Sequence, residues 1–194
     1  SSEHRPEAAR IDGDSQFLWR FPPRRLTAEE VRDSILAASG KLDRTMGGPG
    51  FRLYRYTVDN VATYYPLDNF GPETYRRAVY HQHARSVKPE LLGQFDCPET
   101  SLPAPKRETT TTPLQALSLL NHGFMLDQAR FFAERLKDEA GSNPAAQAER
   151  AFHLAFNRAP DDAERTAAVR FIESQGLEIF CRALFNANEF VYVF

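Results

Sequence analysis

Residues 106–121 read KRETTTTPLQALSLLN, and this stretch divides the chain into two halves of different character. Thr112 is a favourable N-cap because its hydroxyl can accept a hydrogen bond from a backbone N–H group of the first helical turn. Pro113 follows at the first helical position, where its fixed φ suits a helix and its missing N–H group has no helical partner to lose. The stretch therefore predicts a helix that begins at Pro113, ends at Asn121 and starts the C-terminal half.

The rest of the C-terminal half has the apolar periodicity of a helical bundle. Helix start and stop signals divide it into four further helices, and the last is predicted over residues 176–185. The residues that give these signals are Gly141, Asn143, Pro144, Asp161 or Asp162, and Gly176. The apolar tail, residues 190–194, comes last, and we expect it to dock on the bundle because apolar side chains avoid water.

The N-terminal half contains one clear helix signal. Thr27 and Glu30 have the spacing of a capping box, in which each side chain accepts a hydrogen bond from the backbone of the other residue. We therefore predict a helix over residues 27–39. Before it, residues 1–26 contain two adjacent prolines and several aromatic residues. This composition predicts an extended arm that packs on the body.

Two segments of the N-terminal half are typical of strands. Residues 51–58 are rich in aromatic and β-branched side chains, and residues 76–85 alternate in character. We predict that these two strands pair with each other. Residues 60–71, which lie between them, are expected to form a loop, and a short helical turn is predicted from Pro89.

These elements predict a mainly α fold, with a C-terminal helical bundle and a small antiparallel β element in the N-terminal half. We expect one compact domain overall. Within it we distinguish the arm at residues 1–26, a helix with the β element and loops at residues 27–105, and the bundle with its docking tail at residues 106–194.

The composition argues against several classes of function. The 194 residues carry a formal net charge of −2, which does not supply the basic surface of a nucleic-acid-binding protein. No apolar run reaches the roughly 18 residues of a membrane span, so none is predicted. Familiar hydrolase, nucleotide-binding and haem-attachment motifs are absent from the sequence, and we predict no cofactor.

Cysteine and histidine residues give weak signals. Cys97 and Cys181 are the only cysteines, so one disulfide is possible and two buried thiols are the alternative. His81 and His83 would share one face of a strand, which is an arrangement that can bind a metal. Their spacing identifies no third ligand, so surface histidines explain the pattern better and we predict no metal site.

The polar stretch before the Pro113 helix is the candidate ligand-binding site. Helix N-termini attract anions, so Arg107 beside this one could help to bind a carboxylate, sulfate or phosphate. The candidate residues are Arg107, Glu108, Thr110, Asn188, Glu189, Asp43 and Asp96. The alternative is that Thr112 only caps the helix and that Arg107 pairs with an internal acid such as Asp96 or Glu189. In that case the stretch is a clamp between the two halves.

The composition allows two other kinds of site. Aromatic residues could provide platforms for sugars, although aromatic side chains more often belong to the core. These residues are Trp19, Phe21, Tyr54, Tyr56, Tyr64, Tyr65 and Tyr80. Acid–base catalysis would need two carboxylates at a defined separation. The candidates are Asp43, Asp96, Glu108 and Glu189, and the sequence does not place any two of them together.

Several strings occur in the order found in a known family, and the chain resembles domain-of-unknown-function family 1553 over essentially all of its length. The strings are Leu18–Leu26, Arg32–Leu36, Ser39–Asp43, Met46–Pro49, Phe95–Pro98, Arg107–Asn121 and Cys181–Phe190. The residues at Ser1 and Ser2 resemble the middle of the family domain, which implies that a helical portion lies upstream of them.

The resemblance implies a context and identifies no catalytic residue. Family members are large secreted or surface proteins of planctomycetes and related bacteria, and they commonly carry a c-type cytochrome-like domain upstream. They often occur near sulfatases and polysaccharide-degrading enzymes. The resemblance therefore implies an exported module, periplasmic or at the cell surface, that assists polysaccharide binding or processing. The alternatives are a scaffold that docks the upstream domains of the same polypeptide, or a glycan-active hydrolase or lyase.

Overall fold

A computed structural model describes residues 3–58, 60–85, 90–99, 101 and 103–193. These residues form eight α-helices, three short 3-10 helices and two antiparallel sheets of two strands each. The predicted mainly α fold with a small β element is therefore confirmed. The predictions for Ser1, Ser2, Pro89 and Phe194 lie outside the described residues.

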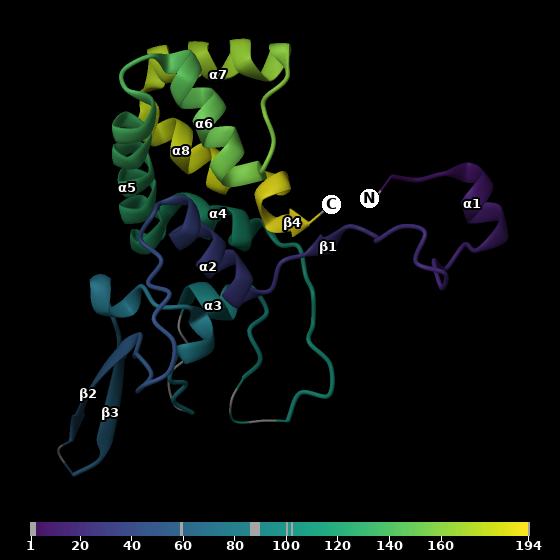
Figure 1. The fold of residues 1–194 in the computed structure, drawn as a ribbon. Coiled ribbons are helices and arrows are strands. Elements are labelled where there is room, and N and C mark those ends of the chain that lie inside the picture. Colours follow the sequence, from purple (N-terminus) through teal and green to yellow (C-terminus); the bar gives the residue numbers. More distant parts are fainter. Residues whose placement is uncertain (1–2, 59, 86–89, 100, 102, 194) are drawn as a thin grey trace.

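The C-terminal half is a bundle of five helices that fill one end of the molecule (Figure 1). They are α4 (Pro113–Asn121), α5 (Gly123–Ala140), α6 (Pro144–Phe156), α7 (Asp162–Gln175) and α8 (Leu177–Phe185). The side chain of Thr112 accepts a hydrogen bond from the backbone N–H of Gln115, and the side chain of Gln115 accepts one from the backbone N–H of Thr112. Asn143 and Asp161 cap α6 and α7 in the same way, by accepting bonds from first-turn N–H groups.

The centre of the bundle is apolar and aromatic. Phe132 on α5 stacks on Phe185 of α8 with ring centroids 5.4 Å apart, and Phe190 packs edge-on against Phe185 at 5.2 Å. Phe190 belongs to the 3-10 helix η3 (Asn188–Val191), and both Phe190 and Val191 are buried. Burying a phenylalanine side chain contributes roughly 1.5–3 kcal/mol, so the end of the chain is held against its own bundle.

Helix α2 (Ala28–Ala38) joins the N-terminal half to this bundle. Its capping box is formed by Thr27 and Glu30. At its C-terminal end, Arg135 on α5 donates hydrogen bonds of 2.9 Å to the carbonyls of Ala37 and Ala38. The Ala37 carbonyl also accepts a 3.2 Å hydrogen bond from the N–H of Gly40. A cationic side chain at a helix C-terminus complements the helix dipole. The helix α3 (Glu90–Gln94) packs beside α2.

The predicted strand pairing is wrong. Strand β2 (Tyr54–Val58) pairs with β3 (Ala62–Pro66), which lies in the segment expected to be a loop. Residues 76–85 contain the 3-10 helix η2 (Ala78–Tyr80) in place of a strand, and η1 (Pro72–Thr74) precedes it. The sequence 61–65 is itself rich in β-branched and aromatic residues, and closing a short hairpin costs less chain entropy than pairing with a distant segment.

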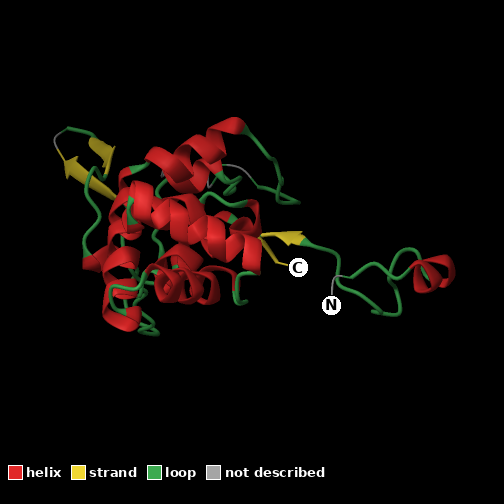
Figure 2. Ribbon diagram, turned by 90° about the horizontal axis from the view of Figure 1, so that it is seen from above, coloured by secondary structure: helices red, strands yellow, loops and turns green. Residues whose placement is uncertain are grey.

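The N-terminal arm also differs from expectation. It begins with the short helix α1 (Pro6–Ile11) rather than an extended segment. Strand β1 (Arg24–Arg25) pairs with the C-terminal β4 (Tyr192–Val193) and so attaches the arm to the body. Before β1, the arm leads away from the helices instead of packing on them (Figure 1 and Figure 2). Within this projecting part, Trp19 donates a 2.7 Å hydrogen bond to the carbonyl of Asp12.

The cap of α4 gives a test of this architecture. Replacing Thr112 with alanine removes the hydroxyl that accepts from the first turn, so we expect the free energy of unfolding to fall by about 1 kcal/mol. Thr109→Ala is the matched control, because Thr109 is an exposed threonine of the same run. Urea denaturation of both variants would measure the difference. Equal losses in the two variants would contradict the capping role.

Candidate functional site

Arg107, the centre of the predicted site, is paired with a residue that sequence reasoning did not select. Its guanidinium donates two hydrogen bonds, of 2.7 and 2.8 Å, to the carboxylate of Glu29 on α2. The prediction that Arg107 pairs with Asp96 or Glu189 is therefore wrong, although its partner is an acid of the same chain. Since the Arg107 side chain is 48% exposed and that of Glu29 is 22% exposed, the pair lies at the surface and partly in water.

Asp96 holds the threonine run instead. Its backbone has a left-handed φ of 59°, which is tolerated by Asp better than by most residues. Its carboxylate accepts hydrogen bonds from the backbone N–H of Thr110 at 2.7 Å and from the Thr110 hydroxyl at 2.8 Å. The two predicted site residues Asp96 and Thr110 are thus brought together, but they satisfy each other.

Gln115 is the centre of the polar contacts behind this run. Its side-chain oxygen accepts from Arg25 at 2.7 Å and from the backbone of Thr112 at 3.1 Å. Its side-chain nitrogen donates to the carbonyl of Gln94 at 2.9 Å and to the Thr110 hydroxyl at 3.2 Å. Gln115 is 2% exposed, so these four bonds use the whole hydrogen-bonding capacity of a buried amide.

Arg25 completes the connection between the two halves. It donates to the hydroxyl of Thr111 at 2.5 Å and lies against the rings of Phe95 and Tyr192, with centroid distances of 5.9 and 5.7 Å. The polar face of α4 is therefore turned inward, and Leu114 and Leu117 are each 54% exposed. These contacts favour the alternative interpretation of the stretch, in which it is a clamp between the halves.

The other predicted site residues lie in different places. Glu189 pairs with Arg158, at 2.6 Å, beside α7. Asn188 and Glu108 are exposed. Asp43 follows α2 and accepts a hydrogen bond from the backbone of Thr45 at 2.8 Å. Three of the four carboxylates considered for catalysis thus contact three separate segments, and these contacts do not assemble an acid–base pair.

Beside the Arg107–Glu29 pair lies an open hollow of about 690 Å³ between α2 and the segment that follows η2. The ionisable side chains that line it are Glu29, Glu30, Asp33, Arg77, His81, His83 and Arg107. Sequence reasoning missed Glu29 and Asp33. The sequence did contain a signal for them. The capping box fixes the start of the helix, and residues four apart on a helix lie on the same face.

Charges in this hollow are mixed. The pKa of Glu29 is lowered, first because Arg107 donates hydrogen bonds to its carboxylate. Burial raises the pKa of Asp33, although the N–H group of Ala78 donates a 2.7 Å hydrogen bond to that side chain. Burial also lowers the pKa of His81 to about 4 and the pKa of His83 below its usual value. Both imidazoles are therefore neutral at pH 7.

Behind the hollow, Arg32 is buried and 2% exposed. It donates a hydrogen bond of 2.9 Å to the carbonyl of Arg76 and another to the carbonyl of Thr74, and its guanidinium lies over the rings of Phe51 and Phe124. Burial lowers its pKa to about 10, so it remains protonated at pH 7. Its contacts with two carbonyls and two rings are those of a structural cation.

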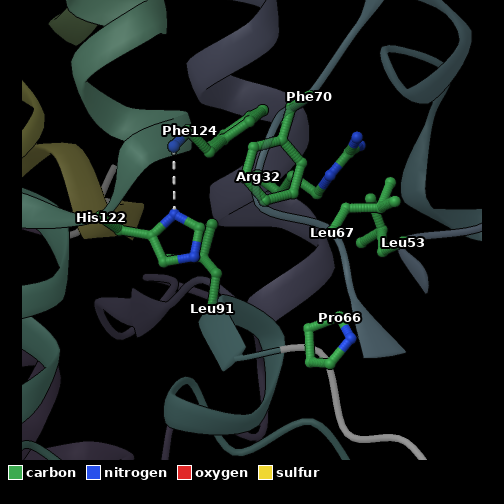
Figure 3. Close-up of a pocket in the computed structure, with 8 residues that line it drawn as sticks. All are labelled: Arg32, Leu53, Pro66, Leu67, Phe70, Leu91, His122 and Phe124. Atoms are coloured by element: carbon green, nitrogen blue, oxygen red, sulfur yellow. Dashed lines mark hydrogen bonds between the residues drawn. The ribbon is translucent and has the colours of Figure 1, made fainter. Parts of the chain in front are cut away.

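Arg32 also lines a small cavity on its other side (Figure 3). The remaining lining residues are mostly apolar: Leu53, Pro66, Leu67, Phe70, Leu91, His122 and Phe124. The volume is about 40 Å³, which suits a few water molecules and is far smaller than the roughly 300 Å³ of a typical ligand pocket. His122 accepts a 3.2 Å hydrogen bond from the backbone of Phe124 there.

The predicted aromatic platforms are only partly exposed. Tyr54 is buried. On the hairpin of β2 and β3, Tyr56 stacks on Tyr64 with centroids 5.8 Å apart, and Arg52 lies over the Tyr56 ring. On the opposite face, Arg55 lies over Tyr65. Tyr56 and Tyr65 are 45% and 44% exposed, so each face of the hairpin offers one accessible ring beside an arginine.

Neither the cysteines nor a cluster of metal ligands adds a further candidate site among the described residues. Cys97 and Cys181 are buried thiols, and burial raises the pKa of the Cys181 thiol. Across the described ranges, no group of three or more His, Cys, Asp or Glu side chains is arranged to hold a metal ion. The same part of the chain contains no helix with the length and apolarity to span a membrane.

A family model described as a protein of unknown function (DUF1553) matches residues 1–172. No curated protein and no solved structure matches the chain.

The Arg107–Glu29 pair predicts a pH dependence of stability. Glu29→Gln should lower the free energy of unfolding at pH 7 by about 1 kcal/mol or less, because the pair is largely solvent-screened. The pKa of Glu29 is lower in the folded protein than its ordinary value of 4.5. The stabilisation is therefore fully present above pH 4.5 and is lost as the pH falls through the folded pKa.

Urea denaturation between pH 7 and pH 3 would measure this difference between wild type and variant. Glu173→Gln, at an exposed position on α7, is the control and should track the wild type at every pH. A destabilisation by Glu29→Gln that does not shrink toward pH 3 would contradict the assignment.

Proposed function

The chain belongs to the DUF1553 family of proteins of unknown function, and from its surfaces we propose that it is a docking module that binds other protein through its N-terminal arm. The observation that carries this proposal is the exposure of large apolar side chains on the arm. Ile11, Phe17, Leu18 and Phe21 are 85%, 82%, 68% and 64% exposed.

These four side chains are exposed within one short segment, in contrast to the apolar side chains of the C-terminal tail. The C-terminal tail, which is equally apolar in sequence, packs its Phe190 and Val191 into the body. A cluster of exposed apolar residues on a projecting segment is the surface expected of a segment that is covered by a partner. Each such side chain contributes roughly 1.5–3 kcal/mol when it is fully buried.

The partner we propose is the upstream part of the same polypeptide. The family resemblance implies that such domains exist in an exported protein and include one that resembles a c-type cytochrome. The arm is well placed to meet them because it projects from the end of the body that carries β1 and β4 (Figure 2). The hydrolase or lyase alternative has less support, since Asp96 and Glu189 are both engaged in structural contacts.

Substitutions in the arm would test the docking function. Phe17→Ser combined with Phe21→Ser should weaken binding to the separately purified upstream portion by at least about tenfold, because buried aromatic anchors dominate most interfaces. Isothermal titration calorimetry would measure the affinity. The folded body should keep its stability, since both phenylalanines are exposed.

The control is Tyr56→Ala, which removes an aromatic side chain that is 45% exposed on the hairpin, at the opposite end of the molecule (Figure 2). This variant should bind as the wild type does. The docking proposal fails if the wild-type chain shows no affinity for the upstream portion, or if the arm variant and the control bind equally well.

A second candidate function is polysaccharide binding by the hairpin. The supporting observation is that Tyr56 and Tyr65 are each exposed beside an arginine, Arg52 or Arg55. Sugars stack on the faces of aromatic rings, and arginine forks can bind carboxylate or sulfate groups of acidic polysaccharides. The genomic neighbourhood implied by the family resemblance agrees with such a ligand.

Affinity electrophoresis in gels that contain neutral or sulfated polysaccharide would test this candidate. The double variant Tyr56→Ala and Tyr65→Ala should migrate without the retardation expected of the wild type, since each ring contributes about 0.5–1.5 kcal/mol. Phe17→Ser is the control and should be retarded normally. Absence of retardation of the wild type in every gel would remove this candidate.

A further inference from the structure

His81 and His83 lie closer together than their sequence positions alone require. His81 Nδ1 and His83 Nε2 are 3.3 Å apart, and the two rings meet edge to face with centroids 4.3 Å apart. The two ring nitrogens face each other, and both residues line the hollow beside Glu29.

The backbone fixes this geometry. Phe51 and His81 form a bridge in which the N–H of Phe51 donates to the carbonyl of Tyr80 at 3.1 Å and the N–H of Gln82 donates to the carbonyl of Phe51 at 2.8 Å. The Phe51 ring also packs on the His81 ring at 5.6 Å. His81 is 7% exposed and therefore has little freedom to reorient.

The two imidazoles can share one proton between the facing nitrogens, which are 3.3 Å apart. This contact uses only one ring nitrogen of each histidine. The other nitrogen of His81, Nε2, is buried and has no hydrogen-bond partner among the described residues. The structure thus buries an imidazole whose polar atoms are incompletely satisfied by protein.

The separation suits two ligands of one metal ion. Imidazole nitrogens bind Zn²⁺ at about 2.0–2.1 Å, so two of them on a tetrahedral centre stand about 3.3–3.4 Å apart. We propose that His81 Nδ1 and His83 Nε2 together bind a divalent transition-metal ion of the kind that imidazole prefers, such as Zn²⁺, Cu²⁺ or Ni²⁺.

The surroundings are compatible with such an ion. Glu29 provides a nearby negative charge, while Arg32 and Arg107 oppose a cation. Arg32 is held by two carbonyls and Arg107 by Glu29, so both positive charges are directed toward other groups.

The proposed site is an open one. Since the described residues offer no cluster of three protein ligands, water completes the coordination on the side of the hollow. Such an ion keeps exchangeable positions and can accept an oxygen or nitrogen ligand from solution. This inference is independent of the docking function, because neither the arm nor the hairpin contributes to the pair.

Titration of the chain with Zn²⁺ would test the proposal. Isothermal titration calorimetry of the wild type should show one equivalent bound. Mutation of residues that only hydrogen-bond to metal ligands weakens metal binding about 10- to 100-fold. Removal of a direct ligand in His83→Ala should therefore weaken Zn²⁺ binding by at least about tenfold. His83 is exposed, and its removal should leave the fold intact by circular dichroism.

His153→Ala is the matched control, because His153 is an exposed histidine on α6. It should bind Zn²⁺ as the wild type does. In NMR spectra of the wild type, Zn²⁺ should shift the ring signals of His81 and His83 and leave those of His153 unchanged. The proposal is overturned if the wild type binds no Zn²⁺, or if His83→Ala binds it as tightly as the wild type.

Discussion

The buried amide of Gln115 is the constraint on which the connection between the two halves depends. A buried side-chain amide that lacks hydrogen-bond partners costs about 1–3 kcal/mol, so the elements around Gln115 must be placed to supply them. They do so from three directions: Arg25 from the end of the arm, the carbonyl of Gln94 from α3, and Thr110 from the threonine run. The start of α4 is thereby fixed against both halves at once.

Helix α2 connects the buried core with the open hollow, because its side chains face both. Arg32 is directed inward, where two carbonyls and two aromatic rings replace its hydration. Glu29 and Asp33 line the open hollow and hold Arg107 and the N–H group of Ala78. A shift of α2 would therefore disturb the buried cation and the hollow together. The position of His81 depends on the same packing, since Phe51 contacts both Arg32 and His81.

Local signals predicted the helical part of the fold well. Capping residues such as Thr27, Thr112 and Asp161 act within one turn, so their effect can be read from neighbouring residues alone. Pairing between distant segments was harder to predict. Arg107 had several acids available in the sequence, and only the folded position of α2 brings Glu29 to it. The strand partner of β2 was missed because residues 76–85 alternate in character as a strand would, whereas β3 follows β2 closely in the segment expected to be a loop.

The exposed aromatic groups show how the molecule divides its surface. The body is closed by polar clamps and ion pairs, such as Glu139 between Arg135 and Arg150 at 2.6 and 2.5 Å. Its largest exposed rings instead belong to two projections, the arm and the hairpin, which leave the body at opposite ends (Figure 2). Apolar surface that faces water lowers solubility. The exposed arm, in contrast to the buried tail, is therefore consistent with the proposed docking surface. Contacts made at either projection would leave the clamp at Gln115 undisturbed, so the proposed docking requires no rearrangement of the core.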